Sequence, residues 1–275
     1  MASRDLDLGD TRVELLSDGT FETGREVIGH AGGEAARAAA QARWGERPLE
    51  LDVNVALLRG PRGIELVDAG TGPSWGTGLG HAPAALRDRG VAPEAVDRIF
   101  LTHIHGDHAL GLLDGDVALF RRAEVLVPAA DLAFFSDPAE RARVPAARQA
   151  GFDIARRITA AYGARLVPVP FGPVAPGVEL LPLPGHTPGQ GGYLFTPAAA
   201  RPSPLLILAD ALHLAIQAED PDIGLVYDLD PARAAATRRA ILARAAAEGW
   251  TVAGAHLPGF ARVVPSGAGF RLAPA

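Results

Sequence analysis

The chain of 275 residues contains no cysteine and no lysine. The lack of cysteine excludes disulfides, thiolate nucleophiles and zinc sites built on cysteine. The lack of lysine excludes Schiff-base chemistry and a phosphate-binding loop, because both depend on a lysine amine. Any metal site must therefore use histidine and carboxylate ligands, which suit zinc, manganese, iron or cobalt.

The sequence also lacks long apolar runs and an excess of positive charge. No apolar run approaches the roughly 20 residues that a membrane-spanning helix needs, and the N-terminus has no signal-peptide pattern. We therefore expect a cytoplasmic protein without a membrane partner. The formal net charge is −6, which disfavours a nucleic-acid partner. The expected partner is a small-molecule substrate, and a homodimer is left open.

Both halves of the chain show strand-like runs followed by a helical segment. This order predicts an α/β protein in which sheets pack between helices, in one domain of residues 1–275. The clearest helix is predicted at 231–248, with Asp230 as its N-cap and Pro231 at its first position. The predicted strands cover 12–17, 52–58, 64–67, 98–101, 125–127, 166–169, 178–181, 192–195, 205–208 and 251–255, with a closing hairpin at 261–264 and 269–272.

Two segments differ from this pattern. Residues 22–48 are rich in alanine and partly helical around 34–43; a cover over the site and a contact with a second subunit both stay open as roles. Residues 129–162 have helical spacing and several aromatic side chains. We interpret them as a helical insertion near the site.

The strongest chemical signal is the run His103-Ile104-His105-Gly106-Asp107-His108, which follows a predicted strand. In an extended segment His103 and His105 lie on one side, because strand side chains alternate. Asp107 and His108 come after the turn at Gly106 and can face another point. One loop can thus supply ligands to two metal ions.

Three distant positions complete a set of metal ligands. His186 lies in a tight loop with glycine and proline on both sides. Asp210 ends an apolar strand, where a carboxylate is costly to bury unless it is paired or bound to metal. Its two oxygens can bridge two cations. His256 also follows a predicted strand.

With these motifs in this order, the sequence resembles the metallo-β-lactamase superfamily, over residues 68–256. The resemblance implies a four-layer αβ/βα sandwich of two mixed β-sheets flanked by helices. It implies two divalent ions, with zinc expected and manganese, iron or cobalt as alternatives, and a hydroxide that bridges them. One ion would be held by His103, His105 and His186, the second by Asp107, His108 and His256, with Asp210 bridging and Asp68 orienting the ligand loop.

The branch that contains methyl parathion hydrolase and related lactonases is the most similar. The segments that carry this likeness are 210–217, 221–222, 228–248, 255–258 and 269–271. A true β-lactamase is disfavoured by Asp210 and by the lack of lysine. One departure is Pro258-Gly259-Phe260, where the branch has Phe-Pro-Gly after His-Leu-Pro. The resemblance implies hydrolysis of a lactone, an ester or a phosphotriester.

Asp107, Asp210 and His213 are the residues expected to act in catalysis. His213 stands where acyl-homoserine lactonases carry a tyrosine that contacts the substrate oxygen, and we expect it near the reacting group. A solvent-facing or core histidine is the alternative. Five aromatic residues are candidates for the walls of the substrate pocket, although core packing is the ordinary role of each: Trp75, Phe134, Phe135, Phe152 and Phe260.

Two other functions stay open. A one-iron oxidoreductase of the same fold, similar to a persulfide dioxygenase, would use His103, His186 and Asp210 for its iron. A metal-stabilised binding module without catalysis is the third reading. Metal analysis combined with an activity screen distinguishes the three.

Overall fold

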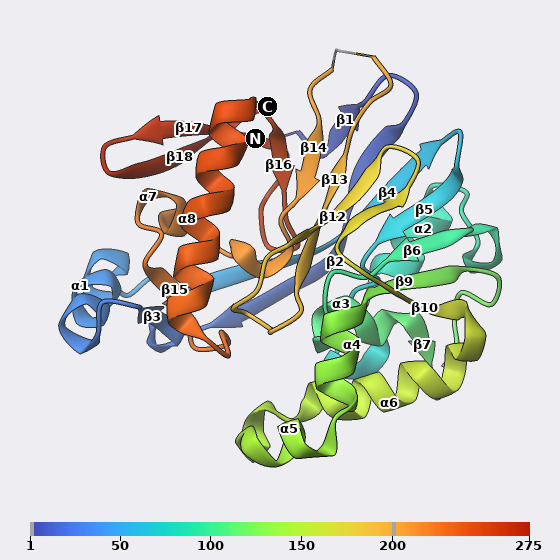
Figure 1. Cartoon of the computed structure of the whole chain (residues 1–275), viewed down its shortest axis with the longest axis horizontal. Coiled ribbons are helices and arrows are strands. Elements are labelled where there is room, and N and C mark those ends of the chain that lie inside the picture. The colour runs from blue at the N-terminus through green and yellow to red at the C-terminus, as the bar shows by residue number, and fades with distance from the viewer. Residues whose placement is uncertain (1–2, 200–201) are drawn as a thin grey trace.

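Two seven-stranded mixed sheets form the centre of the protein in a computed structural model that describes residues 3–199 and 202–275 (Figure 1). In the first sheet the strand order is β1-β2-β4-β5-β6-β9-β10, and in the second it is β11-β12-β13-β14-β16-β17-β18. The run from β5 to β10 is parallel, as is the pair β14–β16. Helices flank both sheets, so the predicted four-layer sandwich is confirmed.

The strands of the first sheet are β1 (Asp5–Asp7), β2 (Arg12–Thr23), β4 (Leu49–Gly60), β5 (Gly63–Val67), β6 (Arg98–Phe100), β9 (Glu124–Pro128) and β10 (Leu166–Val169). Those of the second are β11 (Gly172–Ala175), β12 (Val178–Pro182), β13 (Gly191–Phe195), β14 (Leu205–Ile207), β16 (Thr251–Ala253), β17 (Ala261–Ser266) and β18 (Gly269–Pro274). Two short pairs are added by β3 (Ile28–His30) with β15 (Ile223–Leu225) and by β7 (Leu113–Asp114) with β8 (Val117–Ala118).

The α-helices are α1 (Glu34–Trp44), α2 (Ala82–Asp88), α3 (Gly106–Ala109), α4 (Ala129–Ser136), α5 (Pro138–Arg143), α6 (Ala150–Tyr162), α7 (Ile216–Glu219) and α8 (Pro231–Glu248). The predicted bounds of α8 match, and the Asp230 carboxylate accepts a hydrogen bond from the N–H of Arg233 at 3.0 Å. Among the described residues, no helix has the length and apolar character to cross a membrane.

Apolar side chains on both faces of the strands explain why each sheet is covered on two sides. In β2, Leu15 faces the second sheet, whereas its neighbour Leu16 packs among the residues under the helical layer. In β13, Tyr193 faces the first sheet and Leu194 packs toward α8. Since successive strand side chains point to opposite faces, a continuous apolar run gives a strand that is buried on both sides.

The helical layers lie on opposite sides of the two sheets (Figure 1). Residues 129–162 form α4, α5, a 3-10 turn and α6, and the apolar side of α6 packs against the first sheet. The segment 22–48 adds β3 to β15 and places α1 beside this pair, where Val27, Ile28 and Ala40 share a small apolar cluster with Leu225.

Tyr193 joins the two sheets just before the histidine-rich loop. Its hydroxyl is fully buried, 3.0 Å from the carbonyl oxygen of Leu101 and 3.3 Å from that of Leu126. Leu101 directly follows β6, so this hydroxyl helps to hold the start of the loop against the second sheet.

Replacing Tyr193 with phenylalanine should lower the free energy of unfolding by about 1–2 kcal/mol, because a buried carbonyl loses its donor while the ring is kept. Urea unfolding measures this loss, and an unchanged slope against urea concentration shows that the folded state is intact. A loss below about 0.3 kcal/mol would contradict a role for the hydroxyl in joining the sheets.

Candidate metal centre

The side chains of the candidate centre come from loops at one edge of the two sheets. The loop after β6 carries His103 and His105 and leads into α3, which carries Asp107 and His108. His186 lies between β12 and β13, Asp210 follows β14, and His256 follows β16. Loops at strand ends commonly supply the functional groups of α/β proteins, because the strands hold them rigidly.

The structure brings these residues into two overlapping groups, each of which could hold a metal ion. The ligand atoms within each group lie within 4.8 Å of one another. The first group is His103, His105, His186 and Asp210, and the second is Asp107, His108, Asp210 and His256.

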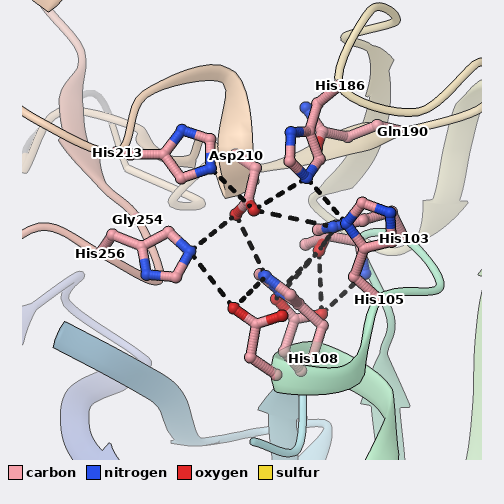
Figure 2. Close-up of polar contacts among 12 residues, drawn as sticks. His103, His105, His108, His186, Gln190, Asp210, His213, Gly254 and His256 are labelled. Atoms are coloured by element: carbon pink, nitrogen blue, oxygen red, sulfur yellow. Dashed lines mark hydrogen bonds and ion pairs between the residues drawn. The ribbon is translucent and has the colours of Figure 1, made fainter. Parts of the chain in front are cut away.

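Asp210 is the residue that the two groups share (Figure 2). Its Oδ2 lies 3.1 Å from Nε2 of His186 and 3.1 Å from Nε2 of His213. Its Oδ1 lies 3.1 Å from Nε2 of His108 and 3.4 Å from Nε2 of His256. One carboxylate oxygen thus points to each group, as a bridging ligand requires.

The donor set fits metal ions. Within the described part of the chain, Nε2 of His103, Nε2 of His108 and Oδ1 of Asp210 are buried and have no hydrogen-bond partner of suitable geometry. Buried polar atoms normally have a partner, so such atoms that converge on one point indicate a bound group. Nitrogen and carboxylate oxygen are ligands that zinc accepts.

The buried carboxylate of Asp210 favours positive charge around it. Burial raises the pKa of Asp210, but the imidazoles of His108 and His256 outweigh it and hold this pKa well below its usual range. Burial followed by repulsion from His186 lowers the pKa of His105 to about 3. Burial also lowers the pKa of His186, but Asp210 and Asp228 outweigh it and raise this pKa to about 9. Bound cations would supply the same charge next to Asp210.

Two strained residues flank the centre. Asp68 and Ala209 have φ of 61° and 50°, a left-handed conformation that residues other than glycine seldom adopt. Ala209 directly precedes Asp210, and Asp68 directly follows β5. Strain of this kind, which costs on the order of 1–3 kcal/mol, concentrates at functional sites.

Asp68, which the sequence predicted to orient the ligand loop, lies behind the histidine-rich loop. Its Oδ2 is 2.8 Å from Nδ1 of His108, and its Oδ1 accepts a hydrogen bond from the N–H of Thr102 at 2.8 Å. A carboxylate on Nδ1 leaves Nε2 of His108 free to face the second group.

Asp228 is a functional candidate that the sequence reading missed. It is buried, and its Oδ1 lies 3.0 Å from Nδ1 of His186, so it orients that ring as Asp68 orients His108. The fully buried Arg238 of α8 lies 3.6 Å from its other oxygen. In the sequence, its position between Tyr227 and Leu229 was the signal that could have identified it.

Residues of β4, in the first sheet, hold His256 and its neighbour Leu257 in place. Nδ1 of His256 lies 2.6 Å from the carbonyl oxygen of Asp52, and the side-chain amide of Asn54 donates to the carbonyl of Leu257 at 2.8 Å. Both partners belong to β4. The second group therefore depends on contact between the two sheets.

A cavity of about 270 Å³ opens onto the centre. Its floor includes His105, Asp107, His186, Asp210, His213 and His256. Its walls are mainly apolar and are formed by Phe21, Leu51, Val53, Trp75, Val226 and Leu229, together with Arg148 and Tyr227. The sequence predicted only Trp75 of these wall residues.

Four aromatic residues predicted for this wall do not line the cavity. Phe135 and Phe152 are buried behind the histidine-rich loop, where the Phe135 ring lies 6.0 Å from that of His105. Phe134 packs on the same cluster and borders a separate surface groove. Phe260 is fully buried between the two sheets. The rings of Phe134, Phe135 and Phe152 support the loop from behind because α4 and α6 turn their apolar sides toward the core.

His213 lies at the centre, and the two remaining histidines do not. The ring of His213 stacks on that of His256 at 4.9 Å, and it lines the cavity. Its Nδ1 has no hydrogen-bond partner among the described residues. His30 instead contacts Asp220 at 3.2 Å, and His81 is exposed at the start of α2.

Comparisons with known proteins agree with this architecture. The model of the metallo-beta-lactamase superfamily matches residues 49–256. A solved structure described as hydrolase AbOPH in the beta lactamase superfamily has a TM-score of 0.87 and 26% identity, over 100% of this chain and 97% of that chain. AidC, described as a dizinc quorum-quenching lactonase in complex with its product, has a TM-score of 0.83 and 21% identity, over 98% and 96%.

A probable metal-dependent hydrolase from Staphylococcus aureus has a TM-score of 0.78 and 16% identity, over 98% of this chain and 99% of that chain. At such identities the last two likenesses show a shared fold. No curated protein matches the sequence significantly.

We expect the protein to bind two divalent ions per chain, and a chelator should lower its melting temperature. Ions that bind only the folded state stabilise it by about 4 kcal/mol at a thousand times Kd. Metal analysis and thermal unfolding test this, with Asp210→Ala expected to lose both ions and the exposed His81→Ala expected to keep them. A melting temperature that does not respond to chelation would contradict the assignment.

Proposed function

We propose that this chain, which belongs to the metallo-beta-lactamase superfamily, is a two-metal hydrolase of lactone, ester or phosphotriester bonds in partly apolar small molecules. The observation that carries the proposal is the placement of Asp210 between two complete ligand groups. A one-metal enzyme would need only the first group. The second group is equally complete and buried, which favours two ions.

The ligand roles are part of this proposal. His103, His105 and His186 would hold one ion and Asp107, His108 and His256 the other, with a shared Asp210. We propose zinc as the metal. When bound, two such ions would supply a nucleophile derived from water and would polarise the substrate oxygen.

The residues of the chain would orient the reactants and exclude water. Asp210 sets the spacing of the two groups, while Asp68 and Asp228 fix the rings of His108 and His186 through their Nδ1 atoms. Trp75, Phe21 and Val226 form an apolar wall beside this polar floor. A substrate with one apolar part and one hydrolysable oxygen linkage fits such a cavity.

The relatives support the same substrate class. AidC is a lactonase seen with the ring-opened product N-hexanoyl-L-homoserine, which has an apolar acyl chain beside a polar head. The guanidinium of Arg148 donates to the backbone carbonyls of Asp228 and Val226, so it is engaged with the protein rather than directed at an anion. We therefore propose neutral substrates.

His213 would hold a proton at Nε2 for the substrate oxygen. Nε2 lies 3.1 Å from Asp210 Oδ2, at the floor of the cavity. Nδ1 has no hydrogen-bond partner within the described part of the chain, which fits a neutral ring whose Nε2–H donates. With Oδ2 of Asp210 bound to a metal ion, this N–H would be left to donate a hydrogen bond to a substrate oxygen that gains charge during cleavage.

A screen of acyl lactones, aryl esters and phosphotriesters with metal-quantified protein should show turnover in at least one class. Asp210→Ala should lower kcat/KM at least about 1,000-fold, because both ligand groups lose their shared oxygens. The exposed His81→Ala is the control with unchanged activity. Two bound ions without turnover in any class would contradict a hydrolase, and one bound iron with oxygen uptake on a persulfide would identify the oxidoreductase.

His213→Gln should lower kcat about 10- to 100-fold while the protein keeps two ions, because a hydrogen-bond donor to the reacting oxygen is displaced. Steady-state kinetics and metal analysis on the same sample measure both quantities. His30→Gln, which lies outside the cavity, serves as the matched control. Loss of a metal ion in His213→Gln would instead make His213 a ligand.

A further inference from the structure

Asp131 lies in the first turn of α4, outside the two ligand groups, and is fully buried. Its carboxylate accepts hydrogen bonds from the N–H of Ile104 at 2.8 Å, from Oγ1 of Thr187 at 2.5 Å and from the N–H of Gly189 at 3.2 Å. No arginine forms an ion pair with it in the described structure. The carboxylate therefore faces neutral donors only.

These donors belong to the two loops that build the first ligand group. Ile104 lies between His103 and His105, so its N–H fixes the peptide that sets the direction of both rings. The side chain of Ile104 is itself fully buried in the core under the helical layer. Thr187 directly follows His186. One carboxylate thus connects the loop of His103 and His105 to the loop of His186.

The contact between the two loops is close as well as polar. A Cβ at Gly189 would come within 2.0 Å of the backbone nitrogen of Asp131, so only glycine fits at this point. The N–H of Gly191 also donates to the carbonyl of Thr102 at 3.0 Å. The loop of His186 therefore rests directly on the start of α4 and on the histidine-rich loop.

A buried carboxylate without a cation is an expensive group. Burial raises the pKa of Asp131 to about 6, although the hydrogen bonds from Thr187 and Ile104 lower it. An ionised carboxylate is an acceptor only, and it can satisfy three donors at once. Asparagine would place the two N–H bonds of its amide against the N–H and O–H donors of these loops. At least one of the donors would then be left unpaired.

We propose that Asp131 is a positioning residue of the first metal site: it holds His103, His105 and His186 in register by joining their two loops, whereas Asp228 orients only the ring of His186. The proposal rests on the proposed two-metal centre. Asp68 plays the corresponding part for the second site, because it holds Nδ1 of His108. Each site then has its own buried carboxylate behind its loops.

Zinc titration of the metal-free protein, followed by competition with a chromophoric chelator, tests this role without any substrate. Asp131→Asn should weaken zinc binding at one site about 10- to 100-fold, the usual effect of losing a group behind the ligands. The other site should keep its affinity. Asp137→Asn, the same change at an exposed position six residues further along, is the control with two unchanged sites.

Double variants identify the affected site. In His256→Ala, which retains the first group, Asp131→Asn should still weaken zinc binding; in His103→Ala, which retains the second, it should have no effect. Thr187→Val removes one donor and keeps the shape, so it should give a smaller loss at the same site even where Asp131→Asn folds poorly. Unchanged affinities in Asp131→Asn and Thr187→Val, or equal losses at both sites, would overturn the proposal. Fewer than two zinc ions in the unmodified protein would instead overturn the proposed function.

Discussion

The position of Asp210 is the constraint on which the rest of the centre depends. A carboxylate that is almost fully buried at a strand end must be compensated by positive charge or by several donors. Imidazoles surround it on both oxygens: those of His186 and His213 on one, and those of His108 and His256 on the other. No single loop could supply this arrangement. The two sheets must pack face to face so that their loop ends meet around one side chain.

The ligand loops are in turn held by groups that do not face the centre. Asp68, Asp131 and Asp228 are buried carboxylates, and each bonds a different loop or ring. Backbone groups of β4 hold His256. This outer set explains how loops can present ligands with fixed geometry, since a ligand is only as well placed as its support.

Much of the fold and of the ligand set could be predicted from the sequence, because histidines in a short motif and apolar runs are local signals. Asp131 could not, since it lies 27 residues from Ile104 and 56 from Thr187 along the chain, and nothing local marks such a pairing. Four of the five aromatic residues predicted for the cavity wall lie elsewhere for a similar reason. Adjacent Phe134 and Phe135 show that a helix is partly apolar, but they do not show which surface it covers.

Two of the wall residues that the sequence did not predict lie on extensions of strands, away from the ligand loops. Strands predicted at 12–17 and 52–58 extend to Arg12–Thr23 and Leu49–Gly60, and these extensions carry Phe21 and Leu51 to the mouth of the cavity. Neither residue belongs to a ligand group. In the proposed hydrolase, Phe21 and Leu51 on these strand extensions would contact the apolar part of a substrate, whereas the groups that would act on the scissile bond lie on the anchored loops. Changes at these two wall residues would therefore alter which substrate is accepted without displacing Asp210 or the histidines around it.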